Sequence, residues 1–363
     1  MRIAFFHNLP PGGAQRVLYN EIKGLNEKNI VDLYCYKSTD DSFLNINKIV
    51  NNYFLFNFPQ VKYRISFLTR LLNDLLVFVY LPILSWFIAY KIDQKKYDVV
   101  IVHPDSFTQA PYIIKYLKTP CIYYCHELLR ICYEPELEFK EKVNIVKKLY
   151  EKLTRFIRKN IDSSNAKLAD LILTNSKYIG NKVEKEYARK SIVCYPGVDF
   201  DFFKNEKSVN KKYFLFLGDE IYINGWDRFL KIKEKLINNG FLSNNFKVIK
   251  FRKGSKVSDK KLLNIYQKSI CVFCLSRSEP FGMVGLEALA SGSNVMAVNE
   301  GGYLENIGKV SKEMLISDSI DNFVLPSFSN FKLSKIEERK LHYFSWDNHN
   351  KILTKSILKI VQK

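Results

Sequence analysis

The sequence predicts an α/β protein made of two Rossmann-like, doubly wound domains that face a central cleft. Three observations support this fold class. Short apolar runs alternate with longer amphipathic segments, and the alternation occurs twice along the chain. A polar stretch at about 200–212 separates the two series. The chain has 363 residues, which is too long for one ordinary domain. We expect an N-terminal domain at 1–205 and a C-terminal domain at 206–344.

The first series opens with a strand, "RIAFFHN" (2–8), and a helix, "GGAQRVLYNEIKGLNEK" (12–28). The helix carries apolar residues at helical spacing: Val17, Leu18, Ile22 and Leu25. The runs that follow are apolar on both faces, as strands buried in a parallel sheet are. These strands are expected at 30–37, 97–104, 119–127, 169–176 and 191–197.

The second series restarts the same pattern after the polar linker. A helix at 226–240 ends at Gly240, which suits the left-handed conformation of a helix C-terminus. A second helix is expected at 259–269 and a third from about Met283. The strands between and around them are expected at 213–220, 246–251, 270–276 and 294–299.

Two segments leave alternatives open. Residues 64–92 are very apolar, but Asp74 and Pro82 interrupt any clean membrane-spanning stretch. They form either a buried helix pair over the sheet or a hairpin on a membrane surface, with aromatic side chains at the interface. Residues 139–160 form an amphipathic basic helix, which suits anionic headgroups or an ordinary solvated face.

Composition limits the classes of partner. The formal net charge of +19 fits nucleic acid, anionic lipid or a phosphorylated substrate, and the absence of a nucleic-acid-binding signature argues against the first. Seven cysteines, mostly in apolar runs, indicate reduced thiols. The cysteines around His126 lack a second ligand pair for zinc, so no metal site is expected. "MRIAFFHN" has no signal-peptide pattern, so we expect a cytoplasmic protein, with peripheral attachment to the inner face of the membrane as an alternative.

The stretch "CLSRSEPFGMVGLEALASGSNVMAVNEGGYLE" holds the strongest candidate site. The strand before it ends at the sheet edge where α/β proteins bind ligands, and Pro280 and Gly282 shape a turn into a helix. The N–H groups at that helix start suit a phosphate or a sugar oxygen. Glu279 lies in the turn, and Glu287 lies about one turn into the helix. Carboxylates beside an anion site suit sugar hydroxyls, whereas Glu287 considered alone would be read as a solvated helix residue.

This stretch resembles the C-terminal signature of the family 4 retaining glycosyltransferases of the GT-B fold, with its Glu-x7-Glu pattern, PFG turn and later GG loop. Other segments resemble the family in the same order along the chain: "PPGGAQRVLYN", "YYCHE", "LTNSKYI", "YPGVDFDFF" and "FSWDNHNKIL". The last resembles a closing segment, so the resemblance implies that a final helix at about 345–363 returns to the N-terminal domain.

The resemblance implies a role for each matching residue. Glu279 would bind hydroxyls of the donor sugar, Glu287 would bind the ribose, and His126 would lie near the transferred sugar. Gly12 and Gly13 would let the backbone approach the diphosphate or the acceptor. Backbone amides would meet the sugar and phosphate at Phe281, Gly282, Met283 and Val284. The implied reaction is a metal-independent, retaining hexosyl transfer from a nucleotide-diphosphate sugar, which is a substrate, with no cofactor required.

The chain departs from the family in the loop "LGDEIYINGWDRF". The family places an Arg and a Lys there for the diphosphate, and this sequence has Asp219 and Asn224. Cations from neighbouring loops could replace them, namely Arg252, Lys253 and Arg277.

Three functions follow as hypotheses. The first is a transferase that acts on a glycan or lipid-linked acceptor in surface polysaccharide, lipid-linked glycan or glycolipid synthesis. The second is a catalytically silent GT-B protein that assembles with a glycan-synthesis complex, which the altered loop motivates. The third is a sugar-nucleotide epimerase, and no acid/base set for that reaction can be assembled from the sequence.

Overall fold

The computed structural model describes residues 1–40, 44–59, 67–134, 145–203, 209–250, 257–316 and 333–362. The chain divides into two compact units. Unit 1 comprises Met1–Cys194 and Asn350–Lys363, and unit 2 comprises Tyr195–His349. Val198 lies near the start of unit 2, where it forms a β-bridge with Ser345 of the same unit. Each unit is an α/β layer structure with a parallel sheet, so the predicted fold class is confirmed.

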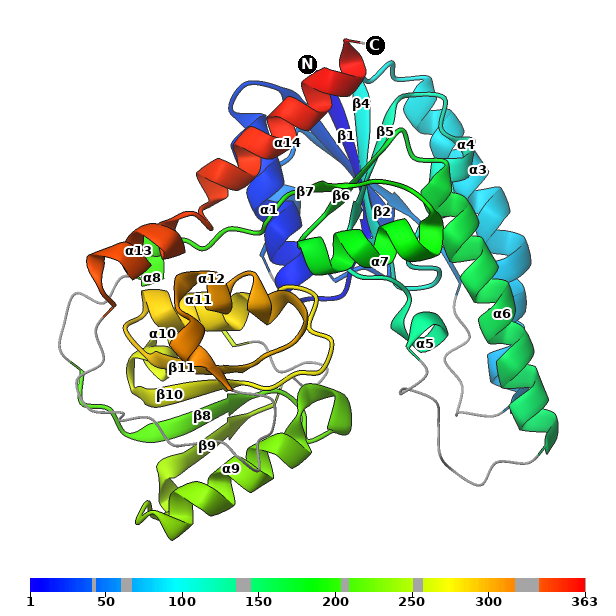
Figure 1. Cartoon of the computed structure of the whole chain (residues 1–363). Coiled ribbons are helices and arrows are strands. Elements are labelled where there is room, and N and C mark those ends of the chain that lie inside the picture. The colour runs from blue at the N-terminus through cyan, green and yellow to red at the C-terminus, as the bar shows by residue number, and fades with distance from the viewer. Residues whose placement is uncertain are drawn as a thin grey trace. The chain divides into compact units, whose positions relative to one another are not determined.

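Unit 1 contains a seven-stranded parallel sheet in the order β3-β2-β1-β4-β5-β6-β7 (Figure 1). The expected first-series strands are present, and β3 is a further edge strand that the apolar pattern did not reveal. The strands are β1 (Arg2–Asn8), β2 (Ile30–Tyr36), β3 (Asn52–Phe56), β4 (Val99–Asp105), β5 (Cys121–Cys125), β6 (Leu171–Thr174) and β7 (Ile192–Val193).

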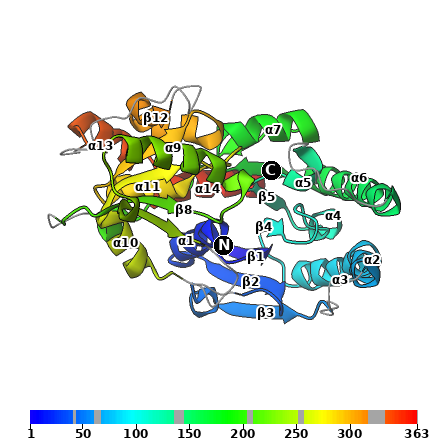
Figure 2. The same ribbon diagram turned by 90° about the horizontal axis from the view of Figure 1, so that it is seen from below.

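Helices cover both faces of this sheet. Figures 1 and 2 show α1 and α14 on one face and α3, α4 and α6 on the other. Gly24 of α1 lies so close to Asn350 of α14 that an added Cβ would meet that side chain at 2.2 Å. The helices are α1 (Gly13–Asn26), α2 (Phe67–Leu75), α3 (Leu81–Asp93), α4 (Ile113–Tyr116), α5 (Arg130–Tyr133), α6 (Ile145–Lys167), α7 (Lys177–Tyr187) and α14 (Trp346–Val361). The part of α14 from Asn350 on belongs to unit 1.

In its described part, 67–92, the apolar segment at 64–92 is neither a helix pair nor a hairpin. From Phe67 to Asp93 the structure has one continuous helix of 27 residues, in which a π turn at Leu76–Tyr80 joins α2 to α3. Pro82 lacks an N–H and would clash with the carbonyl four residues earlier, and the π turn just before it accommodates this defect. Asp74 is buried against α6, where it accepts hydrogen bonds from Tyr150 and Arg158. Pro82 is therefore accommodated by the π turn, and Asp74 is accommodated by its hydrogen bonds from α6.

Unit 2 contains a five-stranded parallel sheet in the order β12-β11-β10-β8-β9. Its strands are β8 (Tyr213–Leu217), β9 (Phe246–Ile249), β10 (Ser269–Cys274), β11 (Asn294–Val298) and β12 (Leu315–Ile316). Its helices are α8 (Phe200–Phe203), α9 (Trp226–Asn238), α10 (Asp259–Gln267), α11 (Met283–Ala290), α12 (Ile307–Val310) and α13 (Lys335–His342). One apolar core runs through the unit and includes Phe214, Phe229 and Phe273.

Candidate functional site

The turn before α11 has the geometry that the sequence predicts. Strand β10 ends at Cys274, and α11 begins at Met283 with Gly282 as its N-cap residue. Gly282 has a φ of +85°, and an added Cβ would lie 2.3 Å from the ring of Tyr303, so glycine is required for conformation and for space. Ser278, just before Glu279, also has a positive φ of 51°. This strained backbone directs the loop into the helix N-terminus.

A second loop supports this turn from behind. Gly302 donates its N–H to the carbonyl of Glu279 at 2.8 Å. A Cβ on Gly302 would lie 2.5 Å from the carbonyl oxygen of Pro280, and a Cβ on Gly301 would lie 2.7 Å from that of Glu279. The Asn306 side chain donates to the carbonyls of Phe281 and Gly282. The absence of side chains at Gly301 and Gly302 thus allows the backbone of this loop to contact the backbone of the Glu279 turn.

The two glutamates have different environments. Glu279 is half-buried in the turn, whereas Glu287 is buried inside unit 2. The hydroxyl of Tyr266, on α10, donates to Oε2 of Glu287 at 3.0 Å. The reading of Glu287 as a solvated helix residue is therefore wrong. No sequence pattern pointed to Tyr266, which is one of the apolar-face residues of its helix.

Arg277 is held against the loop that lacks the expected cations. Its guanidinium pairs with both carboxylate oxygens of Asp227, at 2.8 and 2.7 Å, and stacks over the ring of Tyr222 at 3.6 Å. Its hydrogen bonds to Asp227 lower the pKa of that carboxyl group. Arg277 therefore fixes the Tyr222–Asn224 turn in place, and its positive charge is largely balanced by Asp227. Arg252 and Lys253 lie outside the described residues.

Asp219 and Asn224 lie in the same turn after β8. The Asn224 side chain donates to the carbonyl of Asp219 at 3.3 Å, and an added Cβ on Gly218 would lie 3.3 Å from Asn224. Within the described residues, Oδ1 of Asp219 is buried and has no hydrogen-bond partner. A buried carboxylate oxygen without a hydrogen bond costs folding free energy unless another group donates to it, so Asp219 destabilises this loop.

In unit 1 the glycine loop leads from β1 into α1. Gly12 is the N-cap residue of α1 with a φ of +156°, and an added Cβ would meet no protein atom within 4 Å. Gly13 is exposed at the first position of the helix. The space next to Gly12 is thus open, which is compatible with a ligand approaching the backbone there.

A buried polar chain leads to His126, which directly follows β5. His103, on β4, places Nδ1 3.0 Å from Nε2 of His126 and Nε2 2.7 Å from Oε2 of Glu21 on α1. Both Glu21 and His103 have no solvent exposure, and His126 has 7%. Tyr124 packs its ring against both histidines, at centroid distances of 5.4 and 4.6 Å. The side chain of Asn175 donates to the carbonyl of His126 at 2.8 Å, so backbone and ring are both fixed.

This hydrogen-bonded chain can set the tautomer of His126. When the Glu21 carboxylate accepts a hydrogen bond from Nε2–H of His103, Nδ1 of His103 is left as an acceptor for Nε2–H of His126. Glu21 and His103 were not among the residues that the sequence pointed to. The available signal was a glutamate on the apolar face of a helix and a histidine inside an apolar strand, both of which need a buried partner.

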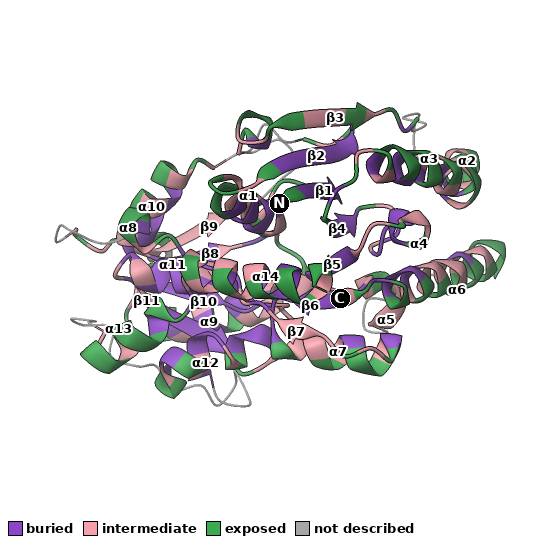
Figure 3. Ribbon diagram, turned by 90° about the horizontal axis from the view of Figure 1, so that it is seen from above, coloured by how far each residue is buried: buried purple, intermediate pink, exposed green. Residues whose placement is uncertain are grey.

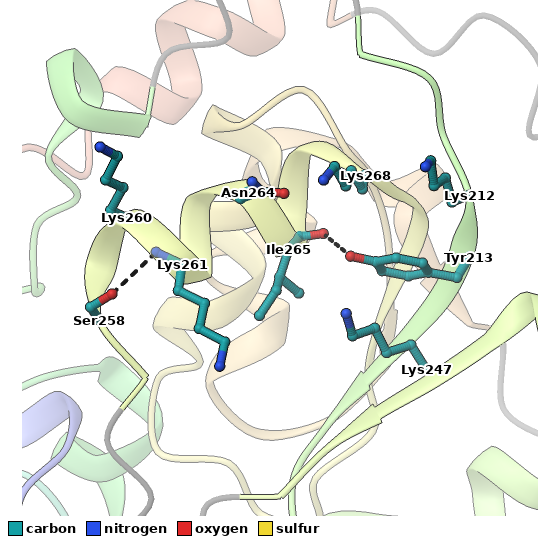
Figure 4. A pocket seen from close by; sticks show the side chains of 9 residues that line it. All are labelled: Lys212, Tyr213, Lys247, Ser258, Lys260, Lys261, Asn264, Ile265 and Lys268. Carbon is teal, nitrogen blue, oxygen red and sulfur yellow. Dashed lines mark hydrogen bonds between the residues drawn. The ribbon is translucent and has the colours of Figure 1, made fainter.

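Unit 2 also has a lysine-lined cavity of about 600 Å³ at α10 and the first residues of β8 and β9 (Figure 4). The Tyr213 hydroxyl closes one side by donating to the carbonyl of Ile265 at 3.2 Å. Within the described part of the chain, no carboxylate lines it, and none of the site residues predicted in the described ranges does. The remaining lining residues are Lys212, Lys247, Ser258, Lys260, Lys261, Asn264 and Lys268. Among the described residues, no group of three or more His, Cys, Asp or Glu side chains could hold a metal ion.

Comparisons with known proteins agree on one family. Residues 11–202 match the family described as Glycosyltransferase Family 4, and residues 223–324 match Glycosyl transferases group 1. An uncharacterised glycosyltransferase of Methanocaldococcus jannaschii is 32% identical over 152 residues, which is 38% of this chain and 42% of that protein. The alpha-1,3/1,6-mannosyltransferase ALG2 of Dictyostelium discoideum is 22% identical over 89% of this chain and 88% of its own length.

Solved structures show the same fold over the full length. Sucrose-phosphate synthase from Thermosynechococcus elongatus superposes with a TM-score of 0.68 at 13% identity, covering 100% of this chain and 99% of that one. HepE from Anabaena, in complex with UDP and glucose, superposes with a TM-score of 0.63 at 17% identity, covering 99% and 100%. At these identities the likeness establishes the fold.

Proposed function

The chain belongs to glycosyltransferase family 4, and we propose that it transfers a hexose from a nucleotide-diphosphate sugar to an acceptor hydroxyl with retention at the anomeric carbon. The observation that carries the proposal is the turn at Glu279, which is held in a strained conformation by the Gly301–Gly302 loop. Such a conformation persists only where the surrounding contacts determine it, and it occurs most often at ligand sites.

The donor is proposed to bind in unit 2. The N–H groups of Phe281 to Val284 would meet the sugar and phosphate, because the first N–H groups of a helix lack intrahelical acceptors. Glu279 would accept hydrogen bonds from the sugar hydroxyls, and Glu287, positioned by Tyr266, would accept those of the ribose. The UDP in the Anabaena structure supports a nucleotide-diphosphate donor.

His126 and the residues behind it are proposed to act on the transferred sugar. The developing positive charge at the anomeric carbon and the leaving diphosphate are the two features that need stabilisation. His126 would offer its carbonyl, fixed by Asn175, and its ring, fixed by His103. Gly12 and Gly13 would allow the backbone to approach the diphosphate or the acceptor.

The acceptor is proposed to be a lipid-linked or membrane-proximal glycan, as in surface polysaccharide, lipid-linked glycan or glycolipid synthesis. The supporting observations are the excess of basic residues and the long apolar helix Phe67–Asp93. A second candidate function is that of a silent binding partner in a glycan-synthesis complex. The observation that favours it is Asp219, a carboxylate where the family has a diphosphate-binding arginine.

A donor screen tests the proposal. The protein is incubated with UDP-, GDP-, ADP-, TDP- and CMP-sugars, and thermal stabilisation and release of free nucleotide are recorded. One sugar nucleotide is expected to stabilise the protein and to be slowly hydrolysed, and both effects should disappear in Glu279→Gln and Glu287→Gln. The matched control is Glu313→Gln, which removes an exposed carboxylate from the same unit. Stabilisation without turnover would favour the silent partner, and no stabilisation by any donor would refute the donor site.

A further inference from the structure

The helix Phe67–Asp93 presents an apolar stripe to solvent along its whole length. Side chains three or four residues apart lie on one helical face, and here every member of that face is apolar. Their exposed fractions lie between 41% and 62%, for Leu68, Leu72, Leu75, Val79, Ile83, Trp86 and Tyr90. At a rise of 1.5 Å per residue, the 27-residue helix is about 40 Å long.

An ordinary surface helix of a soluble domain has a polar outer face, and this one does not. Its inner face is also apolar, because Leu81, Ile88 and Ile92 are fully buried in the core over the sheet. The helix is long and apolar enough to cross a membrane by length and composition, and 33% of its most apolar window is buried. Because the inner face packs on the sheet of unit 1, lipid cannot surround this helix, and only its outer face is available.

Helix α6 adds a second exposed apolar stripe. The exposed fractions of its members lie between 56% and 82%, for Ile145, Val146, Leu149, Leu153 and Phe156. Figure 3 shows both α6 and the α2–α3 helix with exposed outer faces. Exposed apolar surface of this extent is rare on a monomeric soluble protein and marks an interaction site.

Polar contacts fix α6 beside α2. Asp74 accepts hydrogen bonds from Tyr150 and Arg158, and Arg70 forms an ion pair with Glu151. The guanidinium of Arg158 also lies over the ring of Phe78, 5.4 Å from its centroid. The contacts advance in the same direction along both helices, which therefore run parallel. Exposed Leu75 follows the contact residue Asp74 by one position, whereas exposed Leu149 precedes its partner Tyr150 by one. Each step is a rotation of about 100°, and opposite rotations from facing sides of two parallel helices place both stripes on the same side of the pair.

The charge on this surface has one sign. Among the exposed residues of Phe67–Asp93 and of α6, the charged side chains are Arg70, Lys91, Lys147, Lys148, Lys152 and Lys167. The acidic side chains of these segments are buried or paired. Asp74 and Asp162 are buried, Glu151 is 17% exposed and paired with Arg70, and the partly exposed Asp93 accepts hydrogen bonds from Thr119. Trp86 and Tyr90 stack at 6.1 Å near the end that carries Lys91. Aromatic rings beside basic residues are typical of the boundary between lipid tails and headgroups.

We propose that this apolar face, formed by the outer stripes of Phe67–Asp93 and α6, docks on the surface of an anionic lipid bilayer. The aliphatic side chains enter the boundary of the acyl region, and the lysines contact anionic headgroups. A second copy of the chain fits less well, because a two-fold contact between identical faces would bring the same lysines against one another. The proposal does not depend on transferase activity, since membrane binding is measured without donor or acceptor.

Vesicle flotation of the full chain tests this proposal. Vesicles of phosphatidylcholine alone are compared with vesicles that also contain phosphatidylglycerol. The wild type is expected to float with the anionic vesicles, and added salt should weaken the binding. The double variant Ile83→Ser with Trp86→Ser should bind at least about tenfold more weakly, because burial of apolar groups provides most of the affinity. Lys148→Glu with Lys152→Glu should remove the preference for anionic vesicles.

Matched substitutions separate this effect from a general loss of apolar surface. Leu242→Ser with Ile336→Ser removes two apolar side chains of unit 2 that are 66% and 64% exposed, and it should leave flotation unchanged. All variants should retain the wild-type melting temperature, since the substituted side chains are exposed. Equal flotation of the wild type and the Ile83/Trp86 variant, or no flotation of the wild type, would overturn the proposal. So would a lipid-free dimer that the Ile83/Trp86 variant converts to a monomer.

Discussion

Nδ1 of His103 and Nε2 of His126 lie 3.0 Å apart in the interior of unit 1, and the other ring nitrogen of His103 lies 2.7 Å from the buried carboxylate of Glu21. Three residues from three different elements thus form one hydrogen-bonded chain. His126, at the end of this chain, is 7% exposed, whereas the other two residues have no exposure. The two inner residues would be positioning residues, because any effect on substrate would pass through His126.

We predict that Glu21→Gln lowers kcat by about tenfold to a hundredfold, less than the 10²–10⁴ typical of a group that touches the reacting atoms. The donor KM should change little, because Glu21 belongs to unit 1, whereas the proposed donor residues Glu279 and Glu287 belong to unit 2. The loss should fall on kcat, because an amide can hold the His103 ring in either tautomer and the hydrogen bond to His126 is then no longer fixed. Steady-state kinetics measure both constants.

The control for this prediction is Asp32→Asn. Asp32 is also a fully buried carboxylate, and it accepts a hydrogen bond from Tyr97 without contacting His126. It should lower the melting temperature with little change in kcat. The same kinetic effect in both variants would mean that Glu21 has a structural role alone.

Gly302→Ala should disrupt the donor site through the supporting loop. A Cβ there would lie 2.5 Å from the carbonyl oxygen of Pro280 and 2.6 Å from Cα of Phe281, so the Glu279 turn has to move. We expect the donor KM to rise at least about tenfold, the equivalent of about 1.4 kcal/mol. Gly240→Ala is the matched control: its φ is +93°, with nothing within 4 Å of the new Cβ. It should cost about 1 kcal/mol of stability and leave donor binding unchanged. Equal donor KM values for Gly302→Ala and the wild type would contradict the supporting role.

Asp105→Asn should stabilise the protein at neutral and higher pH. Burial raises the pKa of Asp105 from 3.8 to about 6, and within the described residues its Oδ2 has no hydrogen-bond partner. The folded state therefore binds this proton more tightly than the unfolded state. The resulting stability is present below about pH 4 and is lost as pH rises to about 6. At pH 8 the variant should be more stable by about 1–3 kcal/mol, and the difference should vanish near pH 4.

Denaturant unfolding at several pH values measures this difference. Asp98→Asn is the control, because Asp98 is exposed and accepts a backbone N–H from Arg2. Its difference from the wild type should not follow the same pH dependence. A pH-independent effect of Asp105→Asn would show that its buried charge is not what limits stability.

Asp219→Arg combined with Asn224→Lys tests whether the altered loop weakens diphosphate binding. Charge-assisted hydrogen bonds to a phosphate contribute about 1.5–3 kcal/mol each, so restoring one cation or both should lower the donor KM by about tenfold or more. Glu220→Arg adds a cation to the next, exposed position and should have a much smaller effect. Equal effects of the two changes would indicate general electrostatic attraction. Donor binding that only the double variant shows would favour the silent-partner function for the native chain.

The geometry of the turn at Glu279 could be predicted because it is local in sequence. Glu279, Gly282 and Met283 lie within five positions, and turn chemistry sets their geometry without a distant partner. The start of α11 is where the pattern placed it. Tyr266, Tyr303 and Asn306 could not be assigned, because each contacts the site only after strands of the sheet have been brought side by side.

Periodicity was also insufficient for the helix Phe67–Asp93. Asp74 and Pro82 predicted a break in the helix. In the structure a π turn accommodates Pro82, and hydrogen bonds from α6 satisfy Asp74. Those partners come from the segment around Tyr150, far away along the chain. A hydrogen bond of that kind has no signature in the local pattern.

The sequence by itself determined the two α/β series, the positions of most strands and the turn at Glu279, because these depend on hydrophobic periodicity and on backbone sterics between neighbours. Only the tertiary structure decided that Glu21, His103 and His126 form one chain, that Glu287 is buried against Tyr266, and that Arg277 is paired with Asp227. The physical reason is that buried polar groups must find partners. The partner that each buried polar group finds depends on which strands lie side by side in the sheet.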